Sequence, residues 1–478
     1  MLNTSQVRPT QPPKRLPSPV APVGHEKGRD DKLLLYFLAV QFLCQALLMV
    51  ERLGAFRMGF RAATFLSSIG MVILLSSRPA RPHPVCRLAA ITLLILATGL
   101  LHPETIIISG MAHLAFNASI WAPLFWVGRL SLSSRGIWNI LQFMWVFHTV
   151  SAVVGVLQTY YPETFAPSAN FVQSLLGERS ESLLINLADG RRVWRPFGLS
   201  DSPGGAASSG SLAIIIGLVL VTKDVGIVKR LVAAIGIAAG IFCIYICQIR
   251  VILVITLLSA LVMIIVQFLQ GRLTRVAGML LLIPAVLVGG IVWTQDIGGD
   301  AVTKRVRTLT EDTPTAVYYK NRGAFVEHTF ASELPKYPLG AGLGRYGMMY
   351  TYFGDKRIRP LHVEVQITGW LYDAGLLMVA LGYAAVLATC FVTFRIATSR
   401  TADPLLVECA LIIASLNCAW LAVTFSYALF LSQGGMMFWL LNAALYTAAQ
   451  SGGKRVDSAM VVLKPKFKAA PRAERGDR

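Results

Sequence analysis

Long apolar segments recur along this chain from Leu33 onward, separated by shorter stretches that carry most of its charges. A helix needs roughly 20 apolar residues to cross about 30 Å of hydrocarbon, and most of these segments approach or exceed that length. The pattern therefore predicts an all-α polytopic membrane protein with about twelve spans. The predicted spans, of which the third, seventh, eighth and twelfth have the least distinct ends, are 33–50, 58–76, 88–101, 105–128, 137–158, 204–221, 231–248, 251–269, 276–294, 364–393, 404–430 and 435–449.

Composition supports this class, because 55% of the residues are hydrophobic and only 14% are charged. The two ends differ from the rest. Residues 1–32 are rich in proline and basic residues, and residues 450–478 are basic, so both are predicted to be disordered tails. Residues 33–449 then form one transmembrane domain. No small-residue cleavage site follows the first span, which is expected to be an uncleaved anchor.

The basic residues of the short loops predict the orientation, since positive charge near a span is retained on the cytoplasmic side. With the N-terminus inside, the cytoplasmic loops carry most of these residues, and both termini are cytoplasmic. Two longer segments, 159–203 and 295–363, are then periplasmic, the second being a large loop between spans nine and ten. The residues that set this orientation are Arg78, Arg81, Arg87, Arg129, Arg135, Lys223, Lys229, Arg230, Arg272, Arg275, Arg395 and Arg400.

The net charge of +19 raises the question of a polyanionic partner. Much of the excess lies in the tails and cytoplasmic loops, where membrane topology and anionic lipid headgroups account for it. Membrane lipids are therefore expected partners, and nucleic acid is not.

The stretch "YPLGAGLGRYG" at 337–347 has a spacing similar to that of dinucleotide-binding loops. Such a loop needs a strand before it and a helix after it within a βαβ unit, and this context is absent. Two interpretations remain open. The glycines form a flexible turn that returns the chain to the membrane, or they let backbone N–H groups approach an anionic part of a lipid-linked substrate.

Three arginines stand out as candidate anion ligands. Arg250 is a single charge within about forty apolar residues and is expected where spans seven and eight meet at the outer surface. Arg322 falls on an apolar stripe of a segment predicted to be helical up to Pro335, although a structural pair with Asp355 or Glu364 would also explain it. Arg195 lies in "RPFG", just before the Gly/Ser-rich entry to span six. Each could instead anchor the chain to lipid headgroups.

His362 immediately precedes span ten and is the candidate group for taking a proton from a hydroxyl at neutral pH, ahead of His328 and His102. A lone histidine at a membrane interface is also consistent with an ordinary polar position. No cluster of His, Asp or Glu and no D-x-D signature predicts a metal site, and no cofactor is expected.

These features, in this order, resemble the O-antigen ligase and O-antigen polymerase superfamily of bacterial membrane glycosyltransferases. The resemblance covers about residues 137–393 and rests on "RPFG", the arginine that opens span eight, the large outer loop, "YPLGAGLGRYG" and "LHVEVQITGWLYDAGLL". The sequence departs from the family pattern at Val363, where the family usually has Asn, and in its order of acid and glycine at residues 373–375.

The resemblance implies metal-independent transfer of a glycan from undecaprenyl diphosphate on the periplasmic face of the bacterial inner membrane. It assigns Arg195, Arg250 and Arg322 to the diphosphate and His362 to the acceptor. The acceptor would be a glycan in polymerisation of O-antigen or exopolysaccharide, lipid A core in ligation, or a protein hydroxyl. A chain-length regulator is a further candidate partner.

The competing class is a transporter or flippase for lipid-linked glycan without catalysis, for which twelve spans are also common. Transporters bring polar groups to the middle of the membrane and often contain internal repeats. Here the acids within spans are few, chiefly Asp373 and Glu408, and the charges gather on one outer face. This asymmetry favours an enzyme. A purely structural or sensory membrane protein would leave Arg322 on its apolar stripe unexplained.

Overall fold

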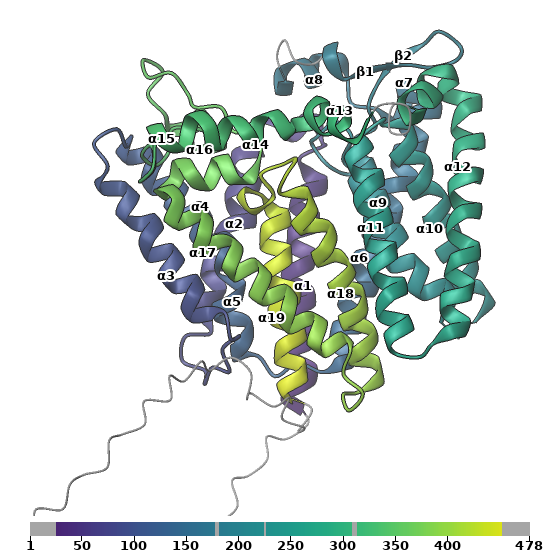
Figure 1. Ribbon diagram of the computed structural model, residues 1–478, viewed down its shortest axis with the longest axis horizontal. Helices are drawn as coiled ribbons and strands as arrows, with labels where there is room; N and C mark the ends of the chain where they lie inside the picture. The colour runs from purple at the N-terminus through teal and green to yellow at the C-terminus, as the bar shows by residue number, and fades with distance from the viewer. Residues whose placement is uncertain (1–24, 177–180, 224–225, 308–312, 452–478) are drawn as a thin grey trace, which may run out of the picture.

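The structure, a computed structural model, describes residues 25–176, 181–223, 226–307 and 313–451. Within these ranges the chain is a bundle of long helices capped at one end by short helices and a two-stranded hairpin (Figure 1). The long helices are α1 (His25–Leu47), α2 (Arg57–Leu74), α3 (Cys86–Thr98), α4 (Ile107–Trp121), α6 (Ser134–Tyr160), α9 (Gly205–Thr222), α10 (Ile227–Ile246), α11 (Arg250–Leu269), α12 (Leu273–Arg307), α17 (Gln366–Ala397), α18 (Pro404–Val423) and α19 (Gln433–Ser451).

Eight helical segments of the described chain are long and apolar enough to cross a membrane by length and composition. Many of their apolar side chains face outward, as expected for helices surrounded by lipid. The chain is therefore a multi-pass helical membrane protein. The eight segments are Glu51–Leu74, Ser134–Tyr160, Gly205–Thr222, Ile227–Ile246, Arg250–Leu269, Leu273–Asp300, Gln366–Ala397 and Pro404–Val423.

Each of the twelve predicted apolar segments contains a helix, but the segments differ in detail from the prediction. The predicted span 105–128 is a pair of helices bent by 46°, Ile107–Trp121 and Pro123–Arg129, and counting that pair as one span brings the candidates to nine. Pro123 explains the bend, because proline cannot donate a helical hydrogen bond. The N-terminal tail also differs, since α1 already begins at His25.

The remaining helices and strands are short and lie mostly at the capped end of the bundle (Figure 1). Strands β1 and β2 pair antiparallel with Ile185 opposite Val193. The short elements are η1 (Glu51–Phe56), η2 (Gly99–Leu101), α5 (Pro123–Trp126), η3 (Val127–Arg129), α7 (Pro162–Phe165), α8 (Ala169–Leu176), β1 (Leu184–Asn186), β2 (Arg192–Trp194), α13 (Pro314–Tyr318), η5 (Tyr319–Gly323), α14 (Ala324–His328), η6 (Thr329–Glu333), α15 (Leu334–Lys336), α16 (Gly347–Phe353) and η7 (Leu429–Leu431).

Polar contacts hold the two ends of the bundle. At the uncapped end, Asp30 of α1 pairs with Arg78 at 2.8 Å and accepts a hydrogen bond from the Ser131 backbone N–H. At the capped end, Asp201 pairs with Arg61 of α2 at 2.5 Å, and Arg61 also donates to the Tyr352 hydroxyl. These contacts join segments that lie far apart in the sequence, at each end of the bundle.

The predicted loop 295–363 is more helical than a connecting loop would be. Helix α12 continues to Arg307 with a break at Gly299, where φ is 56°. Residues 314–336 are helical, as predicted, but the helix breaks at Arg322 and continues through Pro335 to Lys336. The predicted buried stripe is therefore wrong, since Tyr319 and Phe330 are both more than 40% exposed. Residues 308–312 lie outside the described ranges.

The glycine-rich stretch packs against a break in α17 at Ala374 and Gly375. Its Ala341 N–H donates to the Tyr372 carbonyl at 2.8 Å, and the Leu376 N–H donates to the Pro338 carbonyl at 3.0 Å. The break frees the backbone groups of α17 that make these bonds. The stretch is therefore a tightly packed segment with its own fixed partners.

Candidate functional site

The three predicted arginines line one cavity of about 680 Å³ near the capped end of the bundle. Arg195 comes from the loop before α9, Arg250 from the start of α11, and Arg322 from η5. The walls continue along α6, α9 and α18, with further contributions from α1 and α19. Residues separated by more than 120 positions in sequence thus meet at one site.

Arg195 is positioned by the "RPFG" loop, which is fastened to α6. The Arg195 N–H donates to the Leu183 carbonyl at 3.1 Å, next to the β-hairpin. The N–H groups of Phe197 and Gly198 both donate to Oε1 of Gln158, at 2.8 and 2.9 Å. Gly198 has φ of 63° and lies against Ser151, which leaves no room for a Cβ atom. Glycine is needed here for its backbone freedom and for this close approach.

Backbone strain is concentrated at the same cavity. In the described ranges, positive φ at a residue other than glycine occurs at Gln248 (56°) and Arg322 (116°), and both residues line the cavity. Such conformations cost about 1–3 kcal/mol each and persist where the surrounding structure holds them. Gln248 shapes the turn that places Arg250 at the first position of α11.

The cavity is electropositive near the arginines and mainly apolar farther along the helices. Of the described residues that line it, three are arginines and none is Asp or Glu. Helices α9 and α11 begin at its wall, so their positive dipole ends add to the field. The lining beyond the helix starts is mostly apolar, with Met144, Ile215, Ile252, Ile255, Leu416 and Met437. A ligand with an anionic head and an apolar chain would match the basic part and the apolar part of this cavity.

Arg322 has a carboxylate partner in addition to its place at the cavity. Its Nη1 pairs with Oε2 of Glu364 and donates to the Glu364 carbonyl oxygen at 3.2 Å. This is the structural pair that the sequence left open as an alternative to anion binding. Burial lowers the pKa of Arg322 from its ordinary value of 12.5, and the guanidinium stays protonated at neutral pH.

His362 lies beside this pair and does not line the cavity. Its Nε2 is 2.8 Å from Oε1 of Glu364, and its side chain is 57% exposed, close to the Phe325 ring. The structure therefore connects His362 to Arg322 through the carboxylate of Glu364, whereas Arg195 and Arg250 line the cavity directly. His328 pairs with Glu333 at 3.1 Å and, like His102, lies away from the cavity lining.

A histidine among the described lining residues is His148 of α6, which was not predicted from the sequence. Its Nδ1 is 3.3 Å from the Ser209 hydroxyl of α9, and the buried ring makes edge contacts with Phe42 and Phe147, which stack on each other. The sequence does carry a signal for His148, because an ionisable residue inside a predicted span is a candidate functional residue. His148 lies within the predicted span 137–158, where the apolar pattern predicts only a membrane-crossing helix.

The glycine-rich stretch does not reach the cavity. Its Tyr346 hydroxyl donates to Oδ1 of Asp373 at 2.8 Å, and the same oxygen is 2.8 Å from Nε2 of His113. All three side chains are buried. The Leu343 N–H donates to the Thr105 hydroxyl, so this N–H does not face an anion. The N–H groups of Ala341 and Leu343 thus have protein acceptors, and these contacts join the stretch to α4, α17 and the segment before α4.

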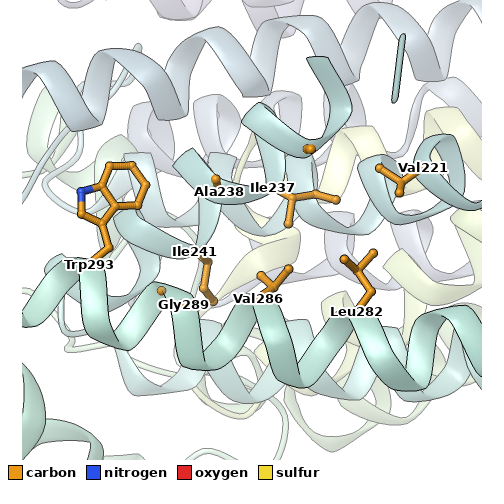
Figure 2. Close-up of a pocket in the computed structure, with 10 residues that line it drawn as sticks. Val221, Ile237, Ala238, Ile241, Leu282, Val286, Gly289 and Trp293 are labelled. Atoms are coloured by element: carbon orange, nitrogen blue, oxygen red, sulfur yellow. The ribbon is translucent and has the colours of Figure 1, made fainter. Parts of the chain in front are cut away.

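A second cavity, of about 240 Å³, lies between α10 and α12 (Figure 2). Leu282, Val286, Gly289 and Trp293 line its α12 side, facing Val221 and residues of α10. The lining is apolar apart from the indole nitrogen of Trp293, which donates to the Tyr160 hydroxyl at 2.8 Å. The lining residues of this second cavity are suited to apolar packing and include no reactive group.

Within the described part of the chain, no three side chains among His, Cys, Asp and Glu gather closely enough to hold a metal ion. No protein-family model matches the chain, and no curated protein is detectably similar to it. The fold and the cavity define a multi-pass helical membrane protein with a cavity lined by three arginines, one of which pairs with Glu364.

Proposed function

We propose that this protein is a glycosyltransferase that moves a glycan from a polyprenyl diphosphate, undecaprenyl diphosphate in bacteria, to an acceptor hydroxyl. The observation that supports this proposal best is the convergence of Arg195, Arg250 and Arg322 on one cavity whose described lining contains no carboxylate. Guanidinium groups are suited to bidentate contacts with phosphate, and a diphosphate supplies two phosphoryl groups for such contacts. The apolar walls suit the prenyl chain.

The chemistry follows from this arrangement. The acceptor oxygen bonds to the anomeric carbon while the bond from that carbon to the diphosphate oxygen breaks, and the electron pair leaves with the diphosphate. The arginines stabilise the growing negative charge. The hydroxyl proton goes to His362, which is worth roughly 10²- to 10⁴-fold in rate. A single displacement of this kind inverts the anomeric configuration.

The proposal extends to topology. Twelve crossings are reached if α1, α3, the bent α4 pair and α19 are added to the eight candidate segments. The capped end then faces the periplasm and the termini face the cytoplasm of a bacterial inner membrane, because the basic short loops lie at the uncapped end. The sequence resemblance to O-antigen ligases and polymerases supports the same orientation.

The acceptor is proposed to be a glycan, in polymerisation of O-antigen or exopolysaccharide, or lipid A core, in ligation. His362 is 57% exposed at the capped end, where a large hydrophilic acceptor has access to it. Glu364 would then link His362, on the acceptor side of the site, to Arg322, on the diphosphate side. If the protein is a polymerase, a chain-length regulator is proposed as a further partner.

Product analysis in liposomes tests the proposal. Purified protein receives lipid diphosphate-linked glycan, with and without lipid A core, beside the variants Arg250→Ala and His362→Ala. Arg357→Ala is a matched control, because Arg357 is an outer-segment arginine with a 90% exposed side chain that does not line the cavity. We expect longer lipid-linked glycans or glycosylated core from wild type and Arg357→Ala, and loss of product in the other two.

The second candidate is transport of the lipid-linked glycan. His148 and Ser209 give the cavity a polar patch well inside α6 and α9, as a permeation path would require. Against it, the two acids within spans have fixed partners, Asp373 with His113 and Glu408 with arginines. Intact glycan crossing the bilayer without a new glycosidic bond would replace the enzyme proposal with this one.

A further inference from the structure

A cluster of positive charges surrounds one buried carboxylate at the uncapped end of the bundle. Glu408 of α18 receives Arg275 at 2.7 Å and Arg272 at 3.2 Å, both on Oε1, and lies 3.8 Å from Lys223 through Oε2. Lys223 also sits over the Trp138 ring, 4.1 Å from its centroid. The cluster therefore joins α18 and α6 to the ends of α9 and α12.

Among the described residues of this cluster, three cations contact one carboxylate, which leaves a surplus of two positive charges among them. The two guanidinium groups share one carboxylate oxygen and therefore lie within about 6 Å of each other, where like charges repel. The Glu408 side chain is 7% exposed, whereas those of Lys223, Arg272 and Arg275 are 24–27% exposed. The cations can thus reach a second anion from outside.

The surface next to the cluster is apolar. Phe268, Leu269 and Leu273 flank Arg272 in the α11–α12 turn, with exposed fractions of 60%, 51% and 61%. In a membrane protein such side chains face acyl chains. The cluster also lies at the ends of α9 and α11 opposite the arginine cavity, so it is separate from the proposed active site.

We propose that Lys223, Arg272 and Arg275 form a binding site for the phosphate of an anionic membrane phospholipid, whose acyl chains lie along Phe268, Leu269 and Leu273. Guanidinium groups match phosphate geometry, and the surplus charge supplies the attraction. The ligand is a lipid and not a soluble anion because the exposed apolar surface adjoins the charges. This site does not depend on the proposed glycosyl transfer.

Native mass spectrometry of the full-length protein, titrated with phosphatidylglycerol or phosphatidylcholine, tests this site. We expect wild type to bind phosphatidylglycerol preferentially, and Arg272→Gln/Arg275→Gln to bind it about 30-fold more weakly. Arg135→Gln, an exposed arginine at the same end of the bundle, is the matched control and should bind as wild type does. Equal binding of the two lipids by wild type would overturn the proposal.

Glu408→Gln distinguishes a lipid site from a purely structural ion cluster. Removing the carboxylate raises the surplus to three charges, so phosphatidylglycerol binding should become tighter even if the protein is less stable. The triple variant Arg272→Gln/Arg275→Gln/Glu408→Gln removes the buried charge left by the double variant and should still bind weakly. Unchanged binding in Glu408→Gln, or full displacement of the lipid by equimolar sodium phosphate, would contradict a phospholipid site.

Discussion

His362 and Glu364 form a pair in which Nε2 of the imidazole lies 2.8 Å from Oε1 of the carboxylate. A neutral imidazole bonded to a carboxylate through Nε2 carries its hydrogen there, which leaves Nδ1 as the nitrogen that can accept a proton. The other carboxylate oxygen of Glu364 pairs with Arg322, a residue of the cavity wall. The Glu364 carboxylate therefore orients His362, the proposed base, and restrains Arg322, which is proposed to bind the diphosphate.

Glu364→Gln should lower kcat for glycan transfer by about tenfold or more, because the amide orients the imidazole and stabilises its protonated form less well. Glu364→Asp should recover part of the loss. Initial rates at saturating donor measure this effect. Glu333→Gln is the matched control, since Glu333 pairs with His328 in the same outer segment. Equal rates in wild type and Glu364→Gln would show that Glu364 is only structural.

Arg250→Ala should reduce kcat by about 10²-fold or more, as does loss of one donor to a developing anion in other enzymes. Arg250→Lys should recover only part of the activity, because lysine keeps the charge and loses the bidentate geometry. The measurement is the rate of diphosphate-carrier release from lipid-linked glycan. Full activity of both variants would remove Arg250 from the mechanism.

Gly344→Ala should destabilise the protein more than Gly347→Ala. Both glycines have positive φ, 76° and 66°, so each alanine incurs about 1–2 kcal/mol of backbone strain. A Cβ atom at Gly344 would also overlap the backbone of Ser109 and Gly110, whereas nothing lies within 4 Å of one at Gly347. Thermal unfolding in detergent compares the two. Equal midpoints would mean that the packing of this stretch on α4 contributes little.

His83 should make stability depend on pH. Its side chain is buried beside the Tyr446 ring in the turn before α3, and burial lowers its pKa from 6.5 to about 3. Below about pH 6.5 the unfolded chain takes up a proton that the folded protein excludes, so the free energy of unfolding decreases as pH falls. Above about pH 6.5, His83 is neutral in both states and does not change the pH dependence of the free energy of unfolding.

The expected slope from His83 is about 1.4 kcal/mol per pH unit between pH 6.5 and about 3. Denaturant unfolding in detergent between about pH 4.5 and 7.5 measures it. His83→Phe should flatten the curve relative to wild type, because it removes the buried imidazole. Parallel curves for wild type and His83→Phe would show that His83 is protonated in the folded state.

The helices were predictable from the sequence because few backbone conformations can cross a lipid bilayer. A long apolar run has to satisfy its backbone internally, and each predicted segment does contain a helix. The bend at Pro123 and the break at Ala374–Gly375 were missed. The second depends on two backbone bonds to the glycine-rich stretch, from the Ala341 N–H to the Tyr372 carbonyl and from the Leu376 N–H to the Pro338 carbonyl, which local sequence does not encode.

Part of the lining of the arginine cavity was predicted from the sequence. Arg250 stood out as one charge in an apolar run, and Arg195 by its place before a Gly/Ser-rich helix entry, and both line the cavity. Arg322 also lines it, but at a strained break, because tertiary contacts with Glu364 override the helical pattern. His362 lies outside the lining, whereas His148 is part of it. Side-chain direction within a bundle depends on packing that the chain order alone does not reveal.

The cavity wall includes Phe42 of α1 and Met437 of α19, the first and last helices of the described bundle. During biosynthesis the arginines would be inserted long before the helix that completes their enclosure. A nascent chain in which α19 has not yet been made would thus lack the part of the cavity wall that Met437 forms. Insertion of α19 is the step that adds this part of the wall to the arginines already in place.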